Sequence, residues 1–98
     1  MSDTPPAATP VLHLDNDRVR VTEWRFAPGA ATGFHEHMMD YVITPLMDGR
    51  LRLIDAEGQV TEAELKRGVS YYRARGVRHD VINAGPGEMA FVEVELKP

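Results

Sequence analysis

The chain has 98 residues, 43% of them hydrophobic and 27% charged, which is the size and composition of one globular domain. Its net charge of −4 without a basic stripe, and its lack of any long apolar run, exclude nucleic acid and membrane as expected partners. The absence of cysteine excludes disulfides and thiolate chemistry, so a metal ion would need imidazole and carboxylate ligands. Because the first residues lack the basic and apolar segments of a signal peptide, we expect a cytoplasmic protein.

The chain divides into a short tail and a β-rich domain. The first ten residues contain three prolines among small residues, and we expect residues 1–10 to be a flexible tail ahead of one domain, residues 11–98. From Val11 onward, short segments rich in β-branched and aromatic residues alternate with turn signals, which is typical of an all-β sandwich or barrel. Residues 61–66 fit a short helix or a strand, and we favour the strand because so short a helix is not stable alone. The other strands are predicted over residues 18–26, 41–47, 51–55, 69–73, 79–83 and 89–96.

Three histidines are candidates for a metal site. His35 and His37 are separated by one residue, and on a strand residues i and i+2 point to the same face, so both imidazoles could reach one ion. Taken alone, such a pair is weak evidence, and two exposed residues without function would be the commoner explanation. His79, at the start of the apolar strand predicted over residues 79–83, is the candidate for a third ligand.

The spacing of these histidines resembles the two motifs of the cupin superfamily, G(x)5HxH(x)3,4E(x)6G and G(x)5PxG(x)2H(x)3N. The residues that carry the resemblance are Gly29, His35, His37 and Gly49 in the first motif, and Gly68, Gly76, His79 and Asn83 in the second. It implies a cupin-type double-stranded β-helix, or jelly-roll barrel, with the three histidines as metal ligands. Residues 40–46 further resemble a group of small bacterial cupins that includes proteins named for β-alanine degradation.

The glycines of the motifs also have an explanation that does not depend on the family. All four glycines of the motifs lie where a strand must reverse, and we expect each of them to take the positive φ that tight turns require. We expect the Asn83 amide to tie down the backbone of the loop that follows it, residues 84–87, rather than to take part in catalysis.

The chain departs from the cupin pattern at two positions. Ala74 stands where the second motif has proline, and the glutamate that completes the metal site would fall at Tyr41 or Val42. Asp40 is the nearest carboxylate and the fourth candidate ligand, but it reaches the site only if residues 38–40 form a loop or bulge, since a one-residue shift along a strand reverses the side chain. Without Asp40, the resemblance implies three imidazoles with open positions, as in the three-histidine dioxygenases of the superfamily. Donor type leaves Fe, Mn, Ni, Zn and Cu as alternatives for a divalent transition metal.

The pocket walls follow from strand parity and from the resemblance. Parity places Ser70 and Tyr72 on one face of their strand and Tyr71 and Arg73 on the other. Related barrels imply that Ser70 and Tyr72 line the site, and Tyr41 could offer its phenol to a ligand. Ordinary wall packing is the alternative for all three.

Three classes of function remain open. The first is a small metal-dependent enzyme, dioxygenase-like or isomerase-like, that acts on a small organic or amino acid, and the open metal site favours it. The second is a non-catalytic module that binds or senses a small molecule, favoured by the lack of an evident acid or base beside the histidines. The third is a structural subunit. Because a small barrel has much exposed sheet edge, we expect a homodimer formed through edge strands.

Overall fold

The structure, a computed structural model, describes residues 4–98, and in this part of the chain it consists of strands, turns and bends. The strands of the described residues are β1 (Thr9–Asp15), β2 (Val19–Phe26), β3 (His35–Glu36), β4 (Asp40–Pro45), β5 (Gly49–Asp55), β6 (Val60–Leu65), β7 (Tyr71–Arg73), β8 (Arg78–Asn83) and β9 (Met89–Leu96). Residues 60–65 are the strand β6, as predicted. A helix long and apolar enough to cross a membrane is absent from the described residues.

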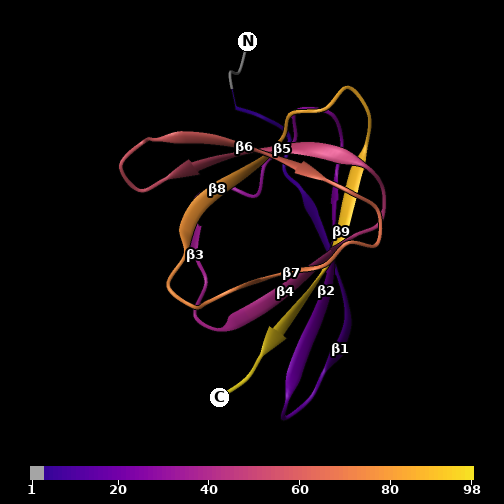
Figure 1. Cartoon of the computed structure of the whole chain (residues 1–98), viewed down its shortest axis with the longest axis vertical. Helices are drawn as coiled ribbons and strands as arrows, with labels where there is room; N and C mark the ends of the chain where they lie inside the picture. Colours follow the sequence, from indigo (N-terminus) through magenta and orange to yellow (C-terminus); the bar gives the residue numbers. More distant parts are fainter. Residues whose placement is uncertain (1–3) are drawn as a thin grey trace.

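Two antiparallel sheets form the molecule. One has the strand order β1-β2-β9-β4-β7 and the other the order β3-β8-β5-β6, and Figure 1 shows the two sheets facing each other across the interior. Every strand pair is antiparallel, and strands distant in sequence, such as β2 and β9, lie side by side. This arrangement is that of a jelly-roll barrel, which confirms the predicted all-β fold.

Part of the inner face of the five-stranded sheet is polar. In register, one inward row runs from Arg20 through Glu95 and Tyr41 to Arg73, and the next contains Glu93. The row on the opposite face is apolar and crosses all five strands: it consists of Leu14, Val21, Val94, Val42 and Tyr72. The alternation of polar and apolar residues in β9 therefore reflects a polar cavity on the inside, not solvent on the outside.

The apolar core lies between the two sheets. Phe26, Leu51 and Met89 are almost fully buried, and the rings of Phe26 and Phe91 have their centroids 5.4 Å apart. Burial of each such side chain stabilises the fold by about 1.5 to 3 kcal/mol. Gly49 allows Met89 to pack directly against the backbone, because a Cβ at position 49 would lie 2.5 Å from the Met89 sulfur.

The motif glycines have two different roles. Gly29, Gly68 and Gly76 have φ values of 79°, 76° and 99°, as expected for tight turns. Gly49 is the exception, since its φ is not positive and its lack of a side chain serves packing against Met89. The expectation of a positive φ was therefore wrong at this one position.

Asn83 joins two turns to each other, the one that follows Phe26 and the loop of residues 84–87. Its Nδ2 donates to the carbonyls of Phe26, Ala27 and Gly87 at 3.2, 3.3 and 2.8 Å, and its Oδ1 accepts the N–H of Gly85 at 3.0 Å. The side chain is buried at 2% exposure, so these contacts replace water completely. The predicted structural role of Asn83 is confirmed.

The N-terminal segment reaches the barrel before residue 11. Residues 1–3 of the expected tail lie outside the described residues. In the remainder, the N–H of Ala8 donates to the carbonyl of Ala31, and the carbonyl of Pro6 accepts from the N–H of Ala31, at 2.8 and 2.9 Å. Since β1 begins at Thr9, the described part of the segment is paired with the barrel rather than free.

Candidate metal centre

Two short strands place the three histidines. β3 pairs with β8 so that His35 and His79 are directly opposite each other. His37 follows β3, and its backbone is fixed to the turn before β8: its N–H donates to the carbonyl of Val77 and its carbonyl accepts from Gly76, both at 2.8 Å. Because Gly76 has a φ of 99°, glycine permits this turn.

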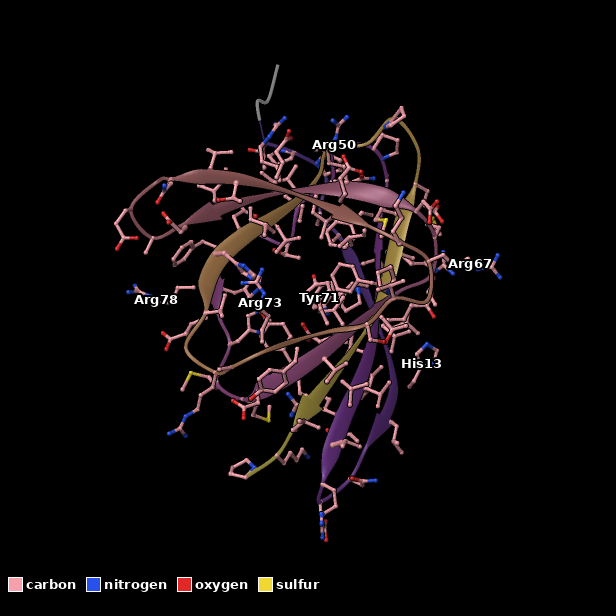
Figure 2. The ribbon with its side chains drawn as sticks, in the orientation of Figure 1. His13, Arg50, Arg67, Tyr71, Arg73 and Arg78 are labelled. Carbon is pink, nitrogen blue, oxygen red and sulfur yellow. The ribbon has the colours of Figure 1, made fainter. Side chains whose placement is uncertain are left out.

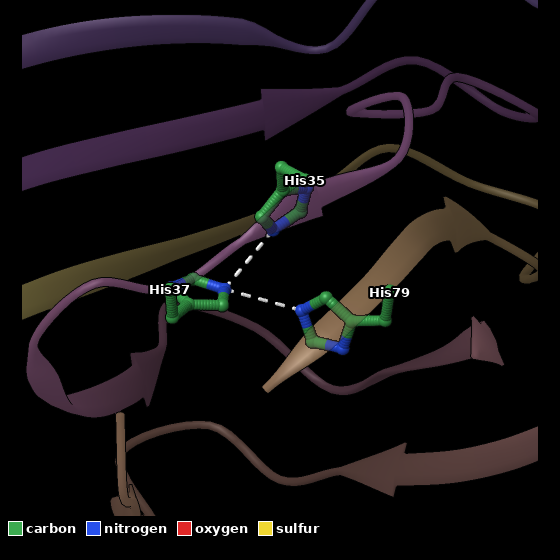
Figure 3. A group of neighbouring side chains, drawn as sticks. All are labelled: His35, His37 and His79. Carbon is green, nitrogen blue, oxygen red and sulfur yellow. Dashed lines mark hydrogen bonds between the residues drawn. The ribbon is translucent and has the colours of Figure 1, made fainter. Parts of the chain in front are cut away.

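The three imidazoles meet at one point. The Nε2 atom of His37 lies 3.0 Å from Nε2 of His35 and 3.1 Å from Nε2 of His79, as Figure 3 shows. All three ligand atoms lie within 4.8 Å of one another, and the rings are nearly perpendicular in each pair. The structure thus brings together the three histidines that the sequence singled out.

A hydrogen bond at the outer nitrogen of His35 leaves a lone pair at its inner nitrogen. Nδ1 of His35 lies 2.9 Å from the carbonyl oxygen of Gly33, which only accepts, so Nδ1 carries the proton and Nε2 of the neutral ring is an acceptor. Nε2 of His37 faces Nε2 of both His35 and His79, and a proton on it could form a hydrogen bond to only one of them at a time. A cation at the centre would take a lone pair from every ring, and the donor set therefore fits a metal ion.

Electrostatics keep two of the rings neutral. The pKa of His37 is lowered to about 3, chiefly by burial and also by the neighbouring imidazoles of His35 and His79. Burial likewise lowers the pKa of His79 to about 4, with His35 and Arg73 adding to the effect. Neutral imidazole is the form that ligates metals, so the site is ready to bind at neutral pH without first losing these protons.

The nitrogen separations also agree with ligation of one ion. With metal–nitrogen bonds of about 2.0 to 2.1 Å, two ligands are about 2.9 Å apart at a right angle and about 3.3 Å apart at the tetrahedral angle. The two shortest Nε2 separations, 3.0 and 3.1 Å, fall between these values.

Asp40 lies outside the histidine group. As the first residue of β4, it accepts the N–H of Arg75 at 2.8 Å and a hydrogen bond from the Tyr72 hydroxyl, and both contacts lower its pKa. The same contact with Asp40 raises the pKa of Tyr72. The carboxylate thus binds residues in and directly after β7, and the structure does not bring it to the other candidate ligands.

A cavity of about 410 Å³ opens beside the histidines. Tyr41 lines it as expected, with its ring stacked on that of His37 at a centroid distance of 3.9 Å. Ser70 and Tyr72 do not line it: Ser70 is exposed and bonded to the Thr44 hydroxyl, and Tyr72 points outward at 56% exposure.

The parity of β7 explains this difference. Tyr71 and Arg73 line the cavity in place of the two residues expected, because Tyr71 pairs with the inward-facing Ile43, whereas Tyr72 pairs with Val42 on the outer face. Strand parity had separated the two sets correctly, but the choice of the inner set was wrong.

Glu93 is a site residue that the sequence did not indicate. It is a buried carboxyl on the cavity wall, its Oε2 atom lies 3.9 Å from Nδ1 of His37, and it accepts a hydrogen bond from the Trp24 indole. Burial raises the pKa of Glu93 to about 7, and the nearby Glu95 adds to the shift. The site therefore contains an acid–base group beside the histidines after all. The available signal was its parity with Phe91, a core residue of the same strand.

The fold and the histidine group define a cupin. Residues 22–95 match the family described as "Cupin domain", and the chain belongs to that family. It is 53% identical to the beta-alanine degradation protein BauB of Pseudomonas aeruginosa over 92 residues, 94% of this chain and 96% of that protein.

Solved structures agree with this assignment. The crystal structure of a cupin domain from Bordetella pertussis Tohama I is 49% identical, with a TM-score of 0.94 over 99% of this chain and 100% of that one. The polyketide cyclase RemF of Streptomyces resistomycificus has a TM-score of 0.70 at 24% identity, over 96% of this chain and 70% of that one, a likeness of fold alone.

Proposed function

We propose that the chain is a metal-dependent enzyme, dioxygenase-like or isomerase-like, that acts on a small organic or amino acid. The observation that carries this proposal is the convergence of three imidazole nitrogens, 3.0 and 3.1 Å apart, at the wall of a cavity. The proposed ligands are His35, His37 and His79. A divalent transition ion bound there supplies Lewis-acid or O2-activating chemistry.

Glu93 supports catalysis over simple binding. Burial raises the pKa of its carboxyl group to about 7, which suits a group that accepts a proton from a substrate or returns one. The Trp24 indole fixes the position of this group on the cavity wall. A module that only binds a ligand has no need of an acid–base group.

The substrate class follows from the cavity and from the relative. A volume of about 410 Å³ suits a small molecule. Since BauB is named for β-alanine degradation and is 53% identical, we propose a β-amino acid or a small carboxylic acid derived from one. The alternative is a module that binds such a molecule without turnover.

Metal content and turnover together test the proposal. Protein purified without an affinity tag should contain a stoichiometric divalent ion by elemental analysis, and His37→Ala should lose it. His13→Ala is the matched control, because His13 lies on the exposed strand β1 and contacts Glu23 instead. Fe(II)-loaded protein is then assayed for oxygen uptake, and for isomer formation by NMR, over β-amino acids, keto acids and thiols. Ligand-dependent thermal shifts without any turnover would favour the binding module.

We also propose a homodimer formed through the outer face of the five-stranded sheet. Its support is the apolar row of Leu14, Val21, Val94, Val42 and Tyr72, which leaves Leu14 and Tyr72 47% and 56% exposed. A second copy is the partner that an apolar row across a sheet fits, because the same row on both subunits pairs about a two-fold axis.

A further inference from the structure

Arg73 differs from most of the other arginines in where its side chain lies. It ends β7, pairs with the inward-facing Tyr41, and lines the cavity beside the three histidines. Arg73 is exposed as well as cavity-lining, so it lies at the mouth of the cavity, and in Figure 2 its label falls within the outline of the barrel, whereas Arg50, Arg67 and Arg78 are labelled at the periphery. The fold thus brings the guanidinium of Arg73, like that of Arg20, to the wall of the candidate site's cavity.

The guanidinium of Arg73 shares the cavity with the imidazoles and is paired across the strands with Tyr41. Its positive charge contributes to the lowered pKa of His79 and offsets the raised pKa of Tyr41. Its Cζ lies 5.8 Å from the ring centre of Tyr71, a cation–π contact that orients the side chain and leaves its N–H groups free.

Arg73 has no carboxylate partner among the described residues. The other cavity arginine, Arg20, is engaged by Glu95 at 3.8 Å and by Asp15 at 3.4 Å. In the inward row, Glu95 and Arg73 flank Tyr41 on either side, but Glu95 pairs with Arg20. One fixed positive charge of the cavity is therefore left to a ligand.

We propose that Arg73 binds the carboxylate of the substrate and so directs the opposite end of the molecule toward the three imidazoles. The inference rests on the proposed function for its substrate class and adds the residue that recognises it. A guanidinium offers parallel N–H groups that match the two oxygens of a carboxylate, which fixes both position and orientation.

The cavity favours one negative charge over two. Three carboxyl groups, Glu36, Glu93 and Glu95, line it together with the arginines Arg20 and Arg73, so that a phosphate dianion would meet more repulsion than a monocarboxylate. The ligand that this charge balance favours therefore carries a single carboxylate.

NMR titration of the 15N-labelled protein, with and without bound metal, measures this recognition. The probes are propanoate, 3-aminopropanoate, the neutral analogue propanamide and inorganic phosphate. We expect both acids to bind more tightly than propanamide and phosphate, and to bind in the absence of metal as well, because their carboxylate contacts Arg73. Failure of both acids to bind, equal affinity for acid and amide, or tighter binding of phosphate would overturn the inference.

Variants assign the contact to one residue. In Arg73→Gln, the Kd of both acids should rise about ten- to a hundredfold while that of propanamide is unchanged, since one charge-assisted contact is lost. Arg73→Lys should recover part of the affinity, because it restores the charge without the planar fork. Arg67→Gln removes an equal charge from the periphery and should leave every Kd unchanged. Unchanged acid binding in Arg73→Gln overturns the inference.

The metal content of the same variants separates this inference from the proposed function. Arg73→Gln should keep the metal, since Arg73 is not among the candidate ligands. If wild-type protein shows no metal or turnover but binds acids through Arg73, the enzyme proposal fails and the recognition of carboxylates stands. If turnover is found and the Kd of the acids is unchanged in Arg73→Gln, the inference about Arg73 is wrong and the enzyme proposal is supported.

Discussion

The carboxyl group of Glu93 lies 3.9 Å from Nδ1 of His37, the ring nitrogen opposite to the one that faces His35 and His79. A carboxylate behind a metal-ligating imidazole favours the proton on the outer nitrogen and so presents the inner lone pair to the ion. The Tyr41 ring stacked on His37 holds the imidazole in the required plane. His37 thus contacts Glu93 at Nδ1, the ring of Tyr41 on one face and the other two imidazoles at Nε2.

Replacing Glu93 should weaken metal binding without disturbing the ligands. In Glu93→Gln the volume is kept and the negative charge is lost, and we expect metal affinity at pH 8 to fall about 10- to 100-fold. At this pH, above the pKa of about 7, the wild-type group is charged. Competition with a chelator of known affinity measures the change. Glu95→Gln, on the same cavity wall but paired with Arg20, should change the affinity much less, and equal losses in both variants would contradict the role given to Glu93.

The turns and the histidine group could be predicted from the sequence because they depend on local spacing. The HxH spacing placed His35 and His37 on one side of the chain, and the second motif added His79 directly opposite His35. Asn83 was predictable for the same reason, since two of its partners lie within four residues of it.

Residues whose role depends on which face is inside could not be predicted in this way. In β9 a polar cavity and solvent produce the same alternation of polar and apolar residues, so the sequence alone does not show that Glu93 faces the cavity. For the same reason, Tyr72 of β7 was expected to line the cavity, whereas the residue that lines it is Tyr71. The structure does not place Asp40 among the candidate ligands, because its carboxylate accepts a hydrogen bond from the backbone of Arg75. Local spacing does not predict a contact between residues so far apart in the sequence.

Stability of the metal-free protein should fall on acidification below about pH 6.5. The unfolded chain gains protons on His37 and His79 near pH 6.5, whereas the folded chain gains them only near pH 3 and 4. Glu93 acts in the opposite direction, because its folded pKa of about 7 exceeds the unfolded value of 4.5. With two protons against one, the unfolded state binds about one more proton, and the free energy of unfolding falls by roughly 1.4 kcal/mol per pH unit between about pH 6 and 4.5.

Chemical denaturation at a series of pH values measures this slope. His37→Gln should make the dependence of stability on pH shallower, because it removes one of the two imidazoles that cause it. His13→Gln, on the exposed strand β1, should leave this dependence unchanged. A wild-type stability that rises from pH 6.5 to 4.5 would contradict the lowered pKa values of the two imidazoles.

Loss of the Asn83 amide should destabilise the fold rather than the chemistry. Asn83→Ala leaves the carbonyls of Phe26, Ala27 and Gly87 without their shared donor, and we expect a loss of about 2 to 4 kcal/mol in the free energy of unfolding. Urea denaturation compares it with Asn16→Ala, where an exposed side chain accepts from two backbone N–H groups and water can replace it. Equal losses at the two positions would show that burial of Asn83 adds nothing.

The outer apolar row predicts how the protein associates. Sedimentation velocity at micromolar concentration should show a dimer, and Leu14→Glu should shift it toward monomer, because a charge in the row must lose its water when the faces pair. Leu12→Glu is the matched control: Leu12 is the more exposed residue, at 60%, but it pairs with the inward-facing Thr22 and so lies off the row. A wild-type monomer would remove the proposed dimer. Dissociation by Leu12→Glu as strong as that by Leu14→Glu would place the contact at the edge of β1 instead of on the outer face of the sheet.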